Sequence, residues 1–354
     1  MKKSLLALAV LTAFAGAASA QSSVTLYGKV DVGGVLESGS PKGKTVKLTS
    51  GITGGSRIGF KGVEDLGGGM KAAFQLETGI CADSNAGAPN FCTGGNNFVG
   101  RQAHVDLIGN FGSVALGRQY TLAFINLTTI DPFGTGLAGQ TTNLFDAAGN
   151  GQGNPRFNNG VVYTTPNMSG FSAAAAVGFG ETQGDWRTGR ATGLAGTYAS
   201  GPLYIGAGYH NVDGPTGILG RKNTNFGGMY DFGVVKLHVL YQATKTAVSS
   251  AAVLVANPTA NEWVDARDAL IGISAPLGGG SLMASGIKHN DRTATNKDAS
   301  QLGVGYMYPL SKRTSLYTSF ARISNKNGAQ LTVGNATEAG SGNKAIDLGV
   351  VHNF

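Results

Sequence analysis

The chain has 354 residues, of which 57 are Gly and 13% are charged, with a mean hydropathy of +0.00 and a formal net charge of +7. This balance excludes a helical membrane protein built from long apolar blocks, and it excludes a charge-rich disordered chain. Pro numbers only 10, so collagen-like and Pro-rich sequences are excluded as well. The net positive charge is small for a chain of this length. It suits local electrostatic fields better than binding along a nucleic acid, so no nucleic-acid partner is expected.

The N-terminus has the pattern of a secretory signal peptide. Two lysines precede an apolar run that ends at Phe14, and Ala18-Ser19-Ala20 supplies the small side chains that a signal peptidase needs. We expect residues 1–20 to be removed and residues 21–354 to form one domain. The alternative, a membrane span, is disfavoured because the run is short and polar residues follow it.

Cys81 and Cys92 are the two cysteines of the chain, and both follow the predicted signal peptide. The segment between them is rich in Asn, Gly and Pro, which suits a loop. In an oxidising compartment a disulfide is expected to close this loop. Two catalytic or metal-binding thiols are the alternative, but no His or further Cys lies nearby in the sequence, and no metal or other cofactor is expected.

Apolar and polar residues alternate along most of the mature sequence. Phe74 and Leu76, for example, alternate with Gln75 and Glu77, which predicts a strand with one apolar and one polar face. No comparable run has helical spacing. The pattern predicts sixteen strands, at 24–36, 56–64, 70–79, 97–108, 113–119, 159–165, 170–180, 191–199, 202–211, 224–232, 234–245, 266–276, 281–290, 299–309, 314–324 and 345–354.

The connections between these strands alternate between short and long. Tight turns occur at 200–202 and 276–280, whereas 181–190 and 248–267 are long and polar. This alternation is typical of an up-and-down barrel that spans a membrane. The segment 120–158 is far longer than a hairpin loop, and loops of this length are usually functional.

The polarity of the two strand faces distinguishes a membrane barrel from a soluble sandwich. One face carries Lys29, Asp31, Arg57 and Glu77, and the opposite face is apolar. A sandwich must bury its apolar face against a second sheet, whereas a barrel in lipid turns that face outward. The sequence therefore predicts an all-β fold, a sixteen-stranded antiparallel transmembrane β-barrel.

Several motifs resemble the general diffusion porins of Gram-negative outer membranes, of the Burkholderia and Neisseria type. They are Val24-Thr25-Leu26-Tyr27-Gly28-Lys29, Arg57-Ile58-Gly59-Phe60-Lys61-Gly62, Gly112 followed by Leu116-Gly117-Arg118, and the terminal Phe354. The resemblance implies a homotrimer in the outer membrane, in contact with lipid and lipopolysaccharide. It also implies passive, cofactor-free diffusion of small hydrophilic solutes and ions, with the third external loop, at 120–158, folded into the pore.

The same resemblance assigns residues to a pore constriction. The motif Asp131-Pro132-Phe133-Gly134 is similar to a loop motif of the family, with few carboxylates beside it, which predicts a mild preference for anions. Alternation with Ala103 would place Arg101 on the apolar face, whereas the resemblance places it in the lumen. The expected constriction residues are the wall bases Lys29, Arg57, Arg101, Arg118 and Arg156 and the loop acids Asp131 and Asp146.

The last predicted strand ends in Phe354 on a stripe with Ile346, Leu348 and Val350, which resembles the assembly signal of outer-membrane barrels. A buried C-terminal strand of a soluble protein is the alternative for this stripe.

For the whole chain, a substrate-specific channel is the main alternative function, and long loops could also serve an adhesin or phage receptor. A barrel enzyme is less favoured, because the five histidines are scattered and form no pair at metal-ligand spacing.

Overall fold

The computed structural model describes residues 23–40, 43–83, 99–145, 155–214, 220–246, 265–334 and 342–354. The predicted signal peptide, Cys92 and Asp146 lie outside these ranges. No helix within them is both long and apolar enough to cross a membrane. The elements are β1 (Ser23–Ser40), β2 (Gly43–Ser50), β3 (Arg57–Gly67), β4 (Met70–Gly79), β5 (Gln102–Gly109), β6 (Gly112–Tyr120), α2 (Leu122–Ile130), η2 (Thr141–Asn143), β7 (Arg156–Thr164), β8 (Phe171–Gly178), β9 (Ala191–Ser200), β10 (Leu203–Val212), β11 (Arg221–Asp231), β12 (Lys236–Thr246), β13 (Asp265–Leu277), β14 (Gly280–Asp291), β15 (Ala299–Pro309), β16 (Thr314–Asn325) and β17 (Lys344–Asn353).

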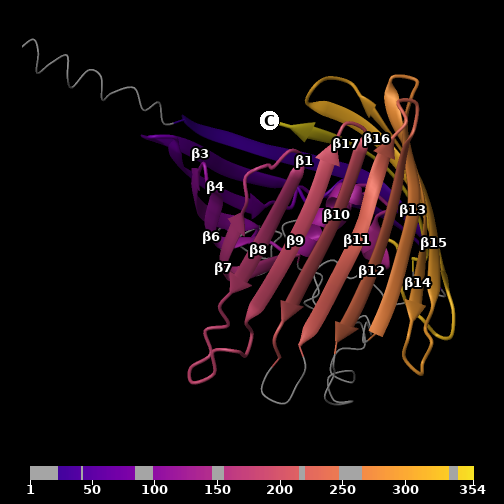
Figure 1. Ribbon diagram of the computed structural model, residues 1–354. Helices are drawn as coiled ribbons and strands as arrows, with labels where there is room; N and C mark the ends of the chain where they lie inside the picture. Colours follow the sequence, from indigo (N-terminus) through magenta and orange to yellow (C-terminus); the bar gives the residue numbers. More distant parts are fainter. Residues whose placement is uncertain are drawn as a thin grey trace, which may run out of the picture.

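The strands form one closed antiparallel barrel (Figure 1). Each strand from β3 to β17 pairs with the next in the chain, and β1 closes the ring by pairing with β17 on one side and β3 on the other. Closure leaves no edge strand to expose unpaired backbone groups to hydrocarbon, where each would cost several kcal/mol. The predicted sixteen-stranded barrel is confirmed.

β2 and β3 together occupy one position in the wall, because each pairs with a different half of β1. The seventeen strands therefore form a barrel with sixteen strand positions. β2 pairs with the second half of β1, where Val32 opposes Ser50, and β3 pairs with the first half, where Lys29 opposes Arg57. Residues 51–56 leave the wall between them. Gly51 and Gly54 have φ values of 79° and 117°, which side chains other than glycine rarely adopt. The predicted strands do not include β2, which adds no further position to the sixteen of the wall.

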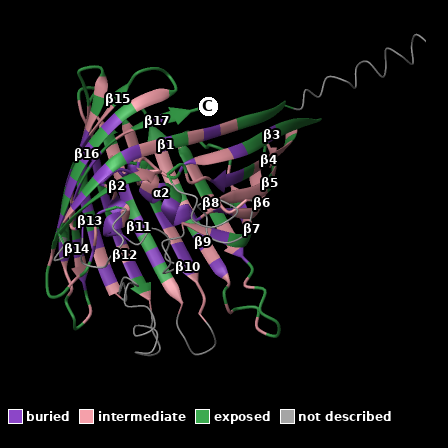
Figure 2. Ribbon diagram, turned by 180° about the vertical axis from the view of Figure 1, so that it is seen from behind, coloured by how far each residue is buried: buried purple, intermediate pink, exposed green. Residues whose placement is uncertain are grey.

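Burial alternates along many strands, as the banding in Figure 2 shows, because successive side chains of a strand point to opposite faces. On β16, Leu316 and Phe320 are exposed on the outside, whereas Tyr317 and Ala321 are buried on the inside. The inner face also carries buried polar groups such as Asp347 of β17. An exposed apolar outer face is what a barrel in lipid requires.

The segment between β6 and β7 lies inside the barrel and carries α2 and η2. The Thr121 hydroxyl caps the N-terminus of α2, which contacts β8 to β12. Leu127 and Ile130 of this helix belong to one buried cluster with Leu240 of β12 and Ile323 of β16. The inner wall is therefore apolar where the loop packs on it, and the polar inner face that the sequence predicts is limited to the remaining wall.

Candidate functional site

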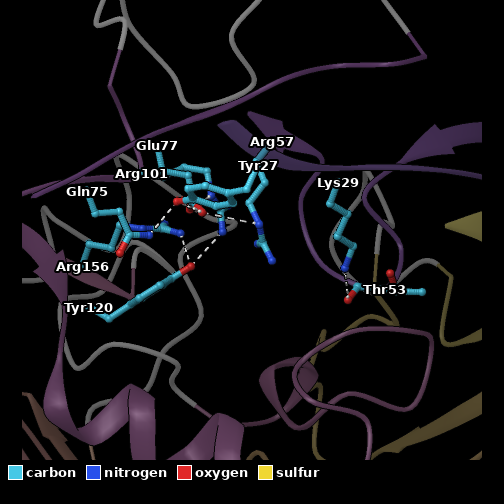
Figure 3. Close-up of polar contacts among 9 residues, drawn as sticks. All are labelled: Tyr27, Lys29, Thr53, Arg57, Gln75, Glu77, Arg101, Tyr120 and Arg156. Atoms are coloured by element: carbon cyan, nitrogen blue, oxygen red, sulfur yellow. Dashed lines mark hydrogen bonds and ion pairs between the residues drawn. The ribbon is translucent and has the colours of Figure 1, made fainter. Parts of the chain in front are cut away.

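A cluster of arginines lies on the inner wall around one carboxylate, that of Glu77 on β4 (Figure 3). Arg101 Nε lies 2.6 Å from Glu77 Oε1, and Arg57 Nε lies 3.5 Å from Glu77 Oε2. The Glu77 side chain is only 5% exposed. Two arginines therefore share one buried carboxylate, which holds both side chains against the wall.

Tyr120, the last residue of β6, joins a third arginine to the cluster. Its hydroxyl accepts hydrogen bonds from Arg101 Nη2 at 2.8 Å and from Arg156 Nη2 at 2.5 Å. The Arg156 guanidinium also lies over the Tyr120 ring, 4.3 Å from its centroid, in a cation–π contact. The Tyr120 hydroxyl thus holds together two guanidinium groups that repel each other.

The charges of the cluster do not cancel. The cluster holds three guanidinium groups, those of Arg57, Arg101 and Arg156, and one carboxylate, that of Glu77, which leaves two positive charges. Arginine suits such a crowded row because it keeps its proton where a lysine can lose it. Arg57 is the more exposed of the two arginines that pair with Glu77, with 29% of its side chain accessible against 11% for Arg101. The wall therefore presents a positive field to the lumen.

The position of Arg101 resolves a conflict between alternation and family resemblance. β5 begins only at Gln102, and the Arg101 amide donates to the Glu77 carbonyl at 3.1 Å from a bend before that strand. The alternation of Ala103 and Val105 therefore does not extend to Arg101. Its side chain lies beside Glu77 and not with the apolar side chains of β5.

Two other predicted bases bond other partners, although Lys29 opposes Arg57 in register between β1 and β3. Lys29 Nζ donates to the Thr53 carbonyl at 3.0 Å, and Figure 3 shows this pair to one side of the arginines. Arg118 donates to the Gly100 carbonyl at 2.9 Å and to the Asn158 side chain. Lys29 therefore lines the segment that separates β2 from β3, whereas Arg118 braces the wall between β5 and β7.

Asp131 organises the loop instead of facing the arginines. Its carboxylate is 4% exposed and accepts hydrogen bonds from the amides of Phe133, Thr135 and Thr141 at 2.9 to 3.0 Å, and from the Thr141 hydroxyl at 2.7 Å. Burial raises the pKa of this carboxyl above its usual value, although these donors oppose the shift. Asp131 thus adds little negative charge to the lumen, and Asp146 lies outside the described residues.

Removing the Asp131 carboxylate is expected to loosen the loop. In Asp131→Ala the amides of Thr135 and Thr141 lose a buried acceptor, and we expect them to exchange with solvent roughly tenfold faster. Hydrogen exchange read by mass spectrometry measures this. Thr142→Ala is the control, since the Thr142 hydroxyl bonds the Gln140 side chain and not Asp131. Equal exchange in both variants would show that Asp131 does not hold the loop.

Hydrogen bonds that were not predicted hold the loop against the wall. The Ala138 amide donates to Ser319 Oγ and to Asp347 Oδ2, both at 2.9 Å, and the Leu137 amide donates to the Ile52 carbonyl at 2.5 Å. Glu77 was also overlooked as a site residue. Its place on the polar face of its strand was the available signal, whereas nothing in the sequence pairs Ala138 with Asp347.

The C-terminal residue is tied to the first strand. The Phe354 amide donates to the Gly28 carbonyl at 3.1 Å, and the Gly28 amide donates to the Phe354 carbonyl at 3.0 Å. A Cβ on Gly28 would lie 2.3 Å from Phe354 Cζ, so the ring covers this glycine.

The described residues include no free cysteine, but Cys92 lies outside them and its pairing with Cys81 stays a prediction.

Comparisons with known proteins point to one family. Residues 7–328 match a family model described as Gram-negative porin. The outer membrane porin protein 32 of Delftia acidovorans is 36% identical over the whole of both chains. The solved anion-selective porin from Comamonas acidovorans is 31% identical, with a TM-score of 0.79 over 94% of this chain and all of that one. The trimer form of OmpT from Vibrio cholerae shares the fold at 15% identity, with a TM-score of 0.65 over 94% of this chain and 99% of that one.

Proposed function

The chain belongs to the Gram-negative porin family and forms a channel in the outer membrane, and from this premise we propose that its pore favours small anions over cations. The observation that carries the proposal is the cluster of Arg57, Arg101 and Arg156 around the single carboxylate of Glu77. A wall with excess positive charge raises the local concentration of anions and lowers that of cations.

The arrangement of the loop supports this preference. In the enclosed lumen a charge acts at a lower effective dielectric constant than in bulk water, and salt screens it over about 10 Å at 0.1 M. Asp131 is buried in the loop and does not balance the arginines across the passage. The relative from Comamonas acidovorans, which is described as anion-selective, is consistent with the same charge balance.

Recordings from the purified protein in planar bilayers test the proposal. With a gradient of KCl we expect a reversal potential of the sign given by chloride permeation, and a smaller selectivity at high salt because of screening. A reversal potential at zero or of cationic sign would refute the preference. Block of the current by one solute at micromolar concentration would instead favour the second candidate function, a substrate-specific channel.

We further propose the assembly that the family resemblance implies. The mature protein, freed of residues 1–20, forms a homotrimer, as the trimer form of OmpT does. A disulfide joins Cys81 to Cys92, and the outer wall contacts lipid and lipopolysaccharide. The channel acts passively, without cofactor or catalysis, as the family resemblance implies.

A further inference from the structure

The helix α2 turns one face away from the wall of the barrel. It lies inside the barrel, where Figure 2 labels it, and it packs against β8 to β12. Ile125, Thr128 and Thr129 are spaced three and four residues apart, so they share one face of the helix, which we name the free face. Because the buried side chains pack on the wall, the free face borders the water-filled passage. The buried side chains are Leu122, Ala123, Phe124, Asn126, Leu127 and Ile130.

Ile125 is an apolar side chain that is exposed inside the barrel. It is 46% exposed, close to the 48% of Ile346, which lies on the outer wall in β17. On the outer wall such exposure suits contact with lipid. In the lumen the same exposure leaves apolar surface in contact with water, which is unfavourable until another apolar group covers it. A passing solute can supply that group.

The rest of the free face is polar but uncharged. The Thr129 hydroxyl donates to the Ile125 carbonyl at 2.7 Å, and the Thr128 hydroxyl donates to the Gly134 carbonyl at 3.2 Å. The first turn of α2 carries no acid and its last turn no base. The free face therefore offers a solute two hydroxyl groups and one isoleucine, and it offers no carboxylate that would repel an anion.

The helix begins directly beside the arginine cluster. The Phe124 ring stacks on the Tyr120 ring, with 5.2 Å between the centroids and 23° between the planes. The Tyr120 hydroxyl in turn accepts hydrogen bonds from Arg101 and Arg156, toward which it points in Figure 3. Ile125 follows Phe124 on the same helical turn. A solute at the guanidinium groups is therefore close to the free face of α2.

We propose that Ile125 makes the pore select, among anions, those that carry an apolar group, such as short aliphatic monocarboxylates. The carboxylate of such a solute interacts with the arginine cluster, while its alkyl group contacts Ile125 and leaves water. A hydroxyl in place of the alkyl group stays hydrated and gains nothing from the isoleucine. The inference rests on the proposed anion preference of the pore, and it names the class of anion that the pore favours.

Isobutyrate and lactate are matched probes for this selection. Both are monoanions with the same number of heavy atoms, and they differ only by a methyl group in place of a hydroxyl. With sodium isobutyrate on one side of a planar bilayer and sodium lactate at equal concentration on the other, the reversal potential of the purified protein gives their permeability ratio. We expect isobutyrate to be favoured roughly threefold, because partial removal of one methyl group from water has about this effect.

Four variants, none of which changes the charge, locate the selection on the helix. Ile125→Thr should bring the ratio close to that of free diffusion, whereas Ile125→Leu should keep the wild-type ratio. Thr129→Val replaces a hydroxyl of the free face by a methyl group of the same size and should raise the ratio. Ile346→Thr makes the substitution at equal exposure on the outer wall and should have no effect.

A gradient of KCl across the same bilayers separates this inference from the proposed function on which it rests. Ile125→Thr should keep the chloride preference of the wild type, because the charges of the wall are unchanged. No chloride preference in the wild type would overturn both proposals. A chloride preference with equal permeability of isobutyrate and lactate, or with a ratio that Ile125→Thr leaves unchanged, would overturn the role of Ile125 alone.

Discussion

Replacing Arg57, Arg101 and Arg156 together by Gln is expected to convert the channel from anion to cation preference. The substitution removes three positive charges and leaves the Glu77 carboxylate, so the local charge changes sign. Gln retains amide donors for Glu77 and Tyr120, which limits collapse of the wall. The ratio of chloride to potassium permeability should fall roughly tenfold or more at low salt and less at high salt. Reversal potentials in asymmetric KCl measure this ratio.

Arg118→Gln is the matched control for that experiment. Arg118 is also an arginine of the wall, but its guanidinium bonds Gly100 and Asn158 instead of the cluster. We expect its reversal potential to match that of the wild type. If the triple variant keeps the wild-type potential, or if Arg118→Gln shifts it equally, the selectivity does not come from the cluster.

Deleting Phe354 is expected to reduce the amount of folded barrel in the outer membrane on the order of tenfold. Without this residue the closing strands leave backbone groups unpaired, and unpaired backbone groups are costly in a membrane. Phe354 makes two backbone hydrogen bonds with Gly28, and its ring covers that glycine on the outer face. The deletion leaves the first strand unpaired at this point. The fraction of heat-modifiable protein in isolated outer membranes, resolved by gel electrophoresis, measures the effect.

Phe226→Ala provides the comparison for this deletion. Phe226 is an outward phenylalanine of β11 with 58% of its surface exposed, but it lies far from the ends of the chain. It should reduce the folded fraction little. A normal yield without Phe354, or an equal loss in Phe226→Ala, would show that the C-terminal aromatic has no special role in assembly.

The wall of the barrel was predictable, and the details that break its regularity were not. Alternation placed Gln75 and Glu77 on the inner face because a strand has a strict period of two. β2 was missed because its alternation covers only Gly43–Ser50 and ends in a glycine-rich segment that reads as a turn. Arg101 lies before its strand begins, where the period no longer applies, and only the family resemblance predicted its direction.

The sequence alone thus determined that the chain forms a barrel, that the barrel has sixteen strand positions and that its outer face is apolar. These properties depend on neighbouring residues, which alternate in a regular strand. Only the tertiary structure determined which charges meet. Glu77, Arg101 and Tyr120 come from different stretches of the chain, and the Asp131 carboxylate is used within its own loop. Contacts between distant strands depend on register and closure, which no local pattern contains.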